Sequence, residues 1–222
     1  MRFQKIFLVA LLTSSSSISF NSDARAFTDT FISNHTSFSE SRIFIAQDKE
    51  VQVGAKNFID KLAQDGIGFL SDESISEIQR KEKFRKFLSK NFDMKAIGRF
   101  ALGRYWRTSS SKEQKEYLDL FEDMIVDIYS KRFKEYNGEA IVIESSRPEG
   151  KSDTIVNSSI VPSNGQKIRV DWRIRYKKGQ YRVIDIMVEG VSMALTQRSD
   201  FASVIQRGGG EVEVLLAHLR VE

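Results

Sequence analysis

Residues 168–175 read Ile-Arg-Val-Asp-Trp-Arg-Ile-Arg, and this segment contains the clearest strand pattern in the chain. Apolar and charged residues alternate in it, which is the period-two pattern of a β-strand with one buried face. Similar patterns predict four strands in all, over residues 140–144, 153–161, 167–176 and 180–189. Because short turn sequences such as Lys177-Lys178-Gly179 separate them, we expect a four-stranded antiparallel meander.

Helical periodicity lies before and after this predicted sheet. Helices are predicted over residues 51–70, 75–87, 93–105, 111–136, 197–206 and 211–220. The helix at 111–136 is predicted to be the longest and to begin with a capping box, Ser111-x-x-Gln114. Blocks of helices and strands, rather than their alternation, predict the α+β class. We expect the sheet to pack against this long helix, with the N-terminal and C-terminal helices forming a lobe.

The N-terminal residues have the pattern of an export signal. Arg2 and Lys5 precede an apolar run over 6–12, and small residues at Ala24 and Ala26 follow. We therefore predict a secretory signal peptide over 1–26, cleaved after Ala26, and hence a periplasmic protein. A retained membrane anchor is the alternative, but the run is too short to span a bilayer.

The remaining chain is predicted to be a flexible polar arm over 27–50 followed by a single domain over 51–222. The whole chain has 34 basic and 30 acidic residues, and without 1–26 its net charge falls from +4 to about +2. This balance does not suit a nucleic-acid-binding protein, which has a basic stripe. The absence of Cys excludes disulfides and thiolate chemistry, so the core alone must hold the fold.

Candidate catalytic residues are few. The only histidines, His35 and His218, lie in the polar arm and in the last predicted helix, and neither has a carboxylate partner at a recognisable spacing. Asp185 on the fourth predicted strand is the strongest remaining candidate, as a general base with a raised pKa in an apolar cone. The alternative is that Asp185 faces water or pairs with Arg173 or Arg175 across the strands.

Apolar residues form a wide stripe before and along the helix at 111–136. The stripe includes Ile97, Phe100, Ala101, Trp106, Phe121, Ile125, Ile128 and Tyr129. Ordinary core packing explains such a stripe in most proteins. The glycines at 98, 103 and 190 interrupt segments that packing alone would fill, which favours the walls of a cavity. From the residues alone both interpretations remain open.

Two sequence blocks resemble those of the MlaC family, also called the toluene-tolerance family. The first is Phe92-Asp93-Met94 followed by Ala101-Leu102-Gly103-Arg104-Tyr105-Trp106. The second is Glu189-Gly190-Val191-Ser192-Met193, followed by Thr196-Gln197 and Phe201, and it is similar to the family's most specific signature. The resemblance covers about residues 58–219, with a departure at Gly208-Gly209-Gly210-Glu211.

This resemblance implies a monomeric periplasmic carrier that holds the acyl tails of a glycerophospholipid in a nuclear-transport-factor-like cone and leaves the headgroup outside. It also implies two partners, an outer-membrane lipoprotein–porin complex and an inner-membrane ABC transporter with a substrate-binding ring, which together maintain outer-membrane lipid asymmetry. No cofactor is implied. The expected apolar cavity is lined by Ile97, Phe100, Ala101, Trp106, Phe121, Ile125, Ile128, Tyr129, Trp172, Ile186, Val188, Val191 and Met193. The alternative is a periplasmic enzyme on the same cone, with Asp185 as general base on a small apolar substrate.

Overall fold

The computed structural model describes residues 38–70, 72, 74–130, 138–162 and 165–221, and the side chains from residue 49 onward except Leu70. The predicted signal peptide and the predicted helix end at 131–136 lie outside the described residues. Residues 51–222 belong to one compact unit, which is described below by itself. No helix in the described ranges is both long and apolar enough to cross a membrane.

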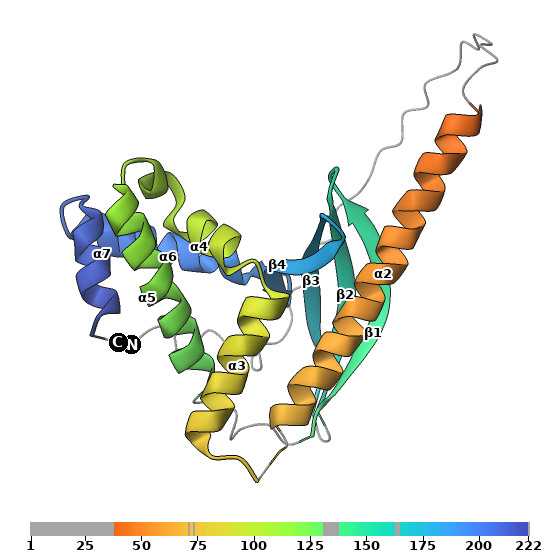
Figure 1. Ribbon diagram of the computed structural model, residues 1–222, viewed down its shortest axis with the longest axis horizontal. Helices are drawn as coiled ribbons and strands as arrows, with labels where there is room; N and C mark the ends of the chain where they lie inside the picture. The colour runs from red at the N-terminus through yellow and green to blue at the C-terminus, as the bar shows by residue number, and fades with distance from the viewer. Residues whose placement is uncertain (1–37, 71, 73, 131–137, 163–164, 222) are drawn as a thin grey trace, which may run out of the picture. The chain divides into compact units, whose positions relative to one another are not determined.

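Helices flank the sheet in the chain, as the sequence predicts (Figure 1). They are α2 (Phe38–Leu70), α3 (Glu77–Asn91), α4 (Met94–Leu102), the 3₁₀ helix η1 (Gly103–Arg107), α5 (Ser111–Ser130), α6 (Met193–Arg207) and α7 (Val212–Leu219). The longest is α2, with 33 residues, so the expectation that the helix at 111 would be longest was wrong. Since α2 begins at Phe38, it also occupies the second half of the segment predicted to be a polar arm.

One antiparallel sheet follows the first five helices, in the order β1-β2-β3-β4-β5. Its strands are β1 (Ala140–Glu149), β2 (Asp153–Val161), β3 (Ile168–Lys177), β4 (Gln180–Val188) and β5 (Val191–Ser192). The α+β class and the antiparallel meander are therefore confirmed. The sheet has one strand more than predicted, because the Glu189–Gly190 turn folds Val191 and Ser192 back onto the end of β4.

The helix that packs on the sheet is α2, not α5. Ala55, Ile59 and Leu62 of α2 are buried with apolar residues of β2, β3 and β4. This sheet cluster contains Ala55, Ile59, Leu62, Val156, Val170, Trp172, Ile174 and Val183. The expectation that α5 would cover the sheet was wrong because periodicity shows that a helix buries one face, but not which partner it meets.

The buried face of α5 instead packs within the helical lobe. Tyr117 and Phe121 of α5 meet Phe201 of α6 with ring centroids 5.9 and 6.2 Å away and nearly perpendicular planes. This helical cluster contains Ala101, Leu102, Tyr105, Tyr117, Phe121, Met124, Phe201, Ile205, Val212, Leu215, Leu216 and Leu219. The described residues thus form two apolar clusters, one on the sheet and one among α4, α5, α6 and α7.

A register shift interrupts the alternation of β4 side chains between the two faces of the sheet. Arg173 pairs with Asp185 and Ile174 with Val183, which leaves Ile184 as an extra residue. Val183 is completely buried and Ile186 packs against the same sheet cluster, although they are three residues apart. Regular alternation would place Val183 and Ile186 on opposite sides of the sheet, but a bulge inverts the alternation after it, and the sequence period does not reveal one extra residue.

Side chains cap the helices at the start of the lobe. The Asp93 carboxylate accepts a hydrogen bond from Ala96 N at 2.9 Å, and Asp93 is therefore the N-cap of α4. The capping box of α5 lies one residue earlier than predicted. Ser110 Oγ accepts from Glu113 N at 3.3 Å, and Glu113 Oε2 accepts from Ser110 N at 2.8 Å. The Ser110 hydroxyl also donates to Glu113 Oε2 at 2.6 Å, and this bond, together with the one from Ser110 N, lowers the pKa of Glu113.

We predict that Ser110→Ala lowers the free energy of unfolding by about 1 kcal/mol, because the first turn of α5 loses its cap. Ser111→Ala is the matched control and should change it by less than about 0.5 kcal/mol. Urea unfolding followed by circular dichroism measures both. Equal effects at the two positions would contradict this assignment of the cap.

Candidate functional site

The residues predicted to line one cavity are divided between the two clusters. Ala101 and Phe121 are buried in the helical cluster, and Ile97, Trp106, Ile125 and Ile128 pack against it. Trp172 is buried in the sheet cluster, Ile186 packs against it, and Val188 is buried as well. Tyr129 and Met193 are half-buried, whereas Phe100 and Val191 are 43% and 50% exposed. A ligand in contact with most of this set would therefore lie between the helical and the sheet cluster.

The glycines that favoured a cavity have other roles. Gly190 has a φ of 80° and, with Glu189 at 50°, forms a two-residue turn in which both central residues have positive φ. Gly103 has a φ of 61° and ends α4. A Cβ on Gly98 would lie 2.8 Å from Leu118 Cδ2, so Gly98 allows α4 and α5 to approach closely. These three glycines are therefore no evidence for a cavity.

Asp185 holds the junction between the sheet and α6. Its Oδ2 accepts a hydrogen bond from Ser192 Oγ at 2.6 Å, and its Oδ1 accepts from Ala194 N at 3.0 Å and from Ile186 N at 2.9 Å. Ser192 Oγ in turn accepts from Leu195 N at 3.0 Å and caps α6. The carboxylate thus has fixed partners on both oxygens, which is the arrangement of an anchor rather than of a general base.

The alternative pairing of Asp185 with Arg173 or Arg175 is not present. Arg173 and Arg175 instead donate to Asp153, with Arg173 Nε 2.9 Å from Oδ2 and Arg175 Nε 2.8 Å from Oδ1. Burial raises the pKa of Asp153, but the hydrogen bonds from Arg175 and Arg173 outweigh it and hold the pKa below its usual range. The polar face of the sheet therefore contains a buried carboxylate held between two guanidinium groups.

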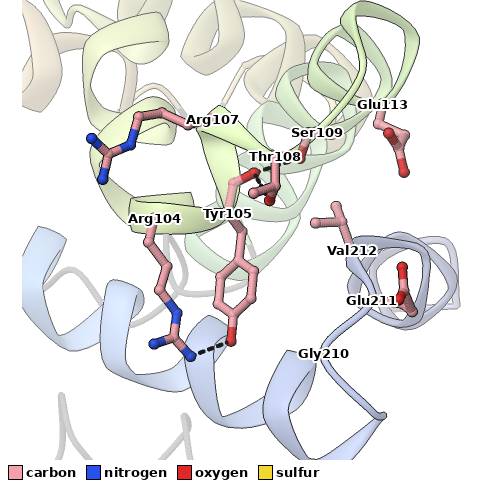
Figure 2. A pocket seen from close by; sticks show the side chains of 9 residues that line it. All are labelled: Arg104, Tyr105, Arg107, Thr108, Ser109, Glu113, Gly210, Glu211 and Val212. Atoms are coloured by element: carbon pink, nitrogen blue, oxygen red, sulfur yellow. Dashed lines mark hydrogen bonds between the residues drawn. The ribbon is translucent and has the colours of Figure 1, made fainter.

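A first pocket of about 450 Å³ opens where η1 and the start of α5 meet the α6–α7 turn (Figure 2). Arg104 lies with its guanidinium carbon 4.9 Å from the centre of the Tyr105 ring and donates to the Tyr105 hydroxyl at 2.9 Å. The lining is mixed in charge: Arg104, Tyr105, Arg107, Thr108, Ser109, Glu113, Gly210, Glu211 and Val212. None of the predicted cavity residues lines it, and its polar walls do not suit an acyl tail.

A second pocket of about 530 Å³ lies between the α3–α4 junction and the β3–β4 hairpin. We call it the basic pocket. It is lined by Ser89, Phe92, Asp93, Met94, Lys95, Arg175, Lys177, Lys178, Gln180 and Arg182. Asp93 N donates to Val183 O at 3.0 Å, and this bond fixes the α3–α4 junction against β4. Five cationic side chains thus surround a space with one carboxylate.

Sequence analysis missed the basic pocket. The sequence pattern could have indicated that Arg175 and Arg182 lie side by side, because they occupy paired positions of adjacent strands. The position of Lys95 was not, since nothing in the sequence indicates that the start of α4 meets β4. In the described part of the chain, no three His, Asp or Glu side chains gather closely enough to hold a metal ion.

Comparison with protein families gives one match over most of the chain. The model of a family described as MlaC protein matches residues 60–221. Two curated proteins are similar to shorter parts. The intermembrane phospholipid transport system binding protein MlaC of Haemophilus influenzae is 24% identical over 121 residues, covering 53% of this chain and 56% of that protein. The toluene tolerance protein ttg2D of Pseudomonas putida is 20% identical over 110 residues, covering 50% and 51%.

Each of these alignments spans about half the length of the curated relative. A solved structure is similar over more of the chain. It is the phospholipid-binding protein from Ralstonia solanacearum in complex with a phospholipid, with a TM-score of 0.65 and 20% identity. The similarity covers 75% of this chain and 94% of that one. At this identity the likeness shows that the two chains share a fold.

We predict that Asp185→Ala lowers the free energy of unfolding by about 2 kcal/mol, because Ser192 Oγ–H and Ala194 N–H lose their acceptor. Asp185→Asn keeps an oxygen at the same place and should cost about 1 kcal/mol or less. Urea unfolding of both variants measures the difference. If Asp185→Ala unfolds like the wild type, the carboxylate is not the anchor of α6.

We further predict that the free energy of unfolding of Asp153→Asn decreases less than that of the wild type when the solution is made acidic. Because the folded pKa of Asp153 lies below the unfolded value of about 3.9, its ionised form adds stability above about pH 4. That contribution disappears as the pH falls through the lowered folded pKa. Urea unfolding of wild type and variant between pH 3 and pH 7 should give curves that converge toward low pH. A constant gap at every pH would contradict this role.

Proposed function

This chain belongs to the MlaC family, and we propose that it binds the acyl tails of a glycerophospholipid and carries the lipid across the periplasm. The observation that carries the proposal is the family match over residues 60–221, which includes the whole helical cluster and all of the sheet cluster except Ala55 and Ile59. The fold shared with a phospholipid-binding protein supports it. The names of both curated relatives are consistent with a part in phospholipid transport or solvent tolerance.

We place the acyl tails between the helical and the sheet cluster. Residues predicted to contact the lipid come from both sides, with Phe121 and Ile125 on α5 and Trp172 and Ile186 on the sheet. Tails that separate these clusters would be in contact with apolar side chains on two sides. We assign the remaining predicted residues to the same proposed site: Ile97, Phe100, Ala101, Trp106, Ile128, Tyr129, Val188, Val191 and Met193.

Energetics favour exchange with membranes over tight binding in water. Burying about thirty methylenes of two tails is worth roughly 24 kcal/mol relative to water. This gross value exceeds the ceiling of about 21 kcal/mol for non-covalent affinity. The competing state is a bilayer, in which the tails are equally dry. A carrier therefore needs only to match the membrane, and small changes of contact at a partner suffice to load or release the lipid.

The partners follow from the same proposal. A periplasmic carrier would receive lipid from or deliver it to an outer-membrane lipoprotein–porin complex and an inner-membrane ABC transporter with a substrate-binding ring. The ATPase of that transporter would supply the energy, so the carrier itself needs no nucleotide site. Transfer between the two complexes would maintain the lipid asymmetry of the outer membrane. The carrier would act as a monomer after cleavage of its signal peptide.

An enzyme with Asp185 as general base is the weaker alternative, because both carboxylate oxygens already accept hydrogen bonds from the chain. Native mass spectrometry of the purified protein separates the two functions. Phospholipid that copurifies with the protein supports the carrier. An empty protein that turns over a small ketone or lactone supports the enzyme.

We predict that Val188→Asp and Ile125→Arg each reduce the phospholipid carried per protein by about tenfold or more. An unpaired charge among acyl tails is strongly disfavoured, whereas water can solvate the same charge when the lipid is absent. The measurement is lipid extracted per mole of protein, with a thermal melt beside it. Val142→Asp on β1 is the control, since Val142 is 45% exposed, and should retain the full load.

Two results would overturn this placement. If both variants fail to fold, the two positions belong to a solid core. If both fold and carry as much phospholipid as the control, neither position contacts the lipid, and the tails do not lie between the clusters.

A further inference from the structure

We propose that the basic pocket holds the phosphate of the lipid headgroup and makes the carrier prefer anionic over zwitterionic phospholipids. The inference rests on the proposed function, because it concerns the headgroup of the same lipid. The recognised chemistry is a phosphodiester or phosphate anion at the end of an apolar chain.

The first support is the excess of positive charge without internal partners. Among the described residues, Lys95, Lys177 and Lys178 have no carboxylate oxygen within 4.0 Å of the ammonium group, so they form no ion pair. The three residues are also exposed. These three lysines line one pocket together with two arginines, which is an arrangement that attracts phosphate groups.

The two arginines of the pocket are oriented by other contacts. Arg175 is held by Asp153, with its Nη2 3.0 Å from Oδ2. Arg182 Nη1 donates to Ser89 O at 2.7 Å, and its Nη2 donates to Gln180 Oε1 at 3.3 Å. None of these bonds to Arg182 neutralises its charge, because both acceptors are uncharged. The pocket therefore presents an uncompensated guanidinium beside three uncompensated ammonium groups.

The single acid of the pocket does not cancel this charge. Asp93 faces the same space, but its carboxylate accepts a hydrogen bond from Ala96 N at 2.9 Å and caps α4. One carboxylate against Lys95, Lys177, Lys178 and Arg182 leaves a net positive site. An anion with one formal negative charge suits such a site better than a neutral group does.

The second support is the position of the pocket relative to the apolar clusters. Phe92 and Met94 are its apolar residues. Phe92 packs against the sheet cluster, and Met94 packs against the helical cluster. The pocket thus begins where the two clusters come closest along the chain. If the tails lie between the clusters, the phosphate of the same lipid molecule can lie beside the pocket lysines.

The headgroup class follows from charge. Phosphatidylglycerol carries one negative charge on its phosphate. Phosphatidylethanolamine carries the same phosphate and, a few bonds away, an ammonium group that the unpaired lysines repel. Because the lysines are exposed and screened by salt, we expect an enrichment of about fivefold in favour of phosphatidylglycerol rather than absolute selection.

The test loads the lipid-free carrier from vesicles of equimolar phosphatidylglycerol and phosphatidylethanolamine at low salt. One variant replaces the pocket lysines, as Lys95→Gln, Lys177→Gln and Lys178→Gln together. The matched control, Lys112→Gln, Lys115→Gln and Lys151→Gln, removes the same charge at exposed positions outside the pocket. The measurements are total lipid per protein and the ratio of the two lipids in it, by mass spectrometry.

We expect wild type and control to carry about fivefold more phosphatidylglycerol than phosphatidylethanolamine, and the pocket variant to carry them about equally with an unchanged total. A wild type without enrichment, or a pocket variant that keeps it, overturns the headgroup assignment while the carrier function stands. A protein that takes up neither lipid refutes the carrier function itself, and the headgroup assignment with it.

A free phosphate compound is the other source of the same chemistry, and a second measurement separates it. Glycerol 3-phosphate titrated onto the lipid-free protein should bind only in the millimolar range or more weakly, since it lacks the tails. Micromolar binding that the pocket substitutions abolish, together with an unchanged lipid ratio, would mean that the pocket serves a soluble phosphate and would overturn the proposal.

Discussion

The register shift between β3 and β4 determines how the sheet is attached to the helical lobe. One extra residue at Ile184 allows Val183 and Ile186 to pack on the same side of the sheet. The same shift leaves Asp185 free to accept hydrogen bonds from Ser192 and Ala194. Without it, a regular strand would place either the apolar pair or the carboxylate on the wrong face. The attachment of the helical lobe to the sheet therefore follows from a local irregularity.

The edge of β4 that faces away from β3 pairs with two other segments of the chain, and these pairings connect the two apolar clusters within one unit. Phe92 bridges to Val183 before the bulge, and β5 pairs with Met187 and Val188 after it. The α3–α4 junction and the start of α6 are thereby fixed to the same strand. This arrangement suits the proposed binding of a large apolar molecule between the clusters. Backbone hydrogen bonds at the edge of β4 connect the two clusters, so the clusters do not have to form one continuous core.

Much of this fold could be predicted from the sequence, because the strands alternate and the helices repeat over long segments. The partner of α5 could not, since an apolar face at Phe121 does not specify whether a sheet or Phe201 covers it. The bulge at Ile184 could not either, because one extra residue leaves the composition of a strand unchanged. For the site, sequence reasoning found apolar residues on both clusters but misread Gly190, whose turn needs a positive φ. Lys95 shows the same limit, since its importance arises from a long-range meeting with β4.

The order of the two clusters along the chain has a consequence for how the protein folds as it appears from its N-terminus. The sheet cluster draws on residues from Ala55 to Val183, whereas the helical cluster joins Ala101 to Leu219. The sheet can therefore complete its apolar packing while α6 and α7 are still absent. Until those helices arrive, Tyr117 and Phe121 have no cover from Phe201. A chain that folds from its N-terminus therefore leaves the aromatic face of α5 exposed until its last two helices are added, and in this interval that face is open to non-native apolar contacts.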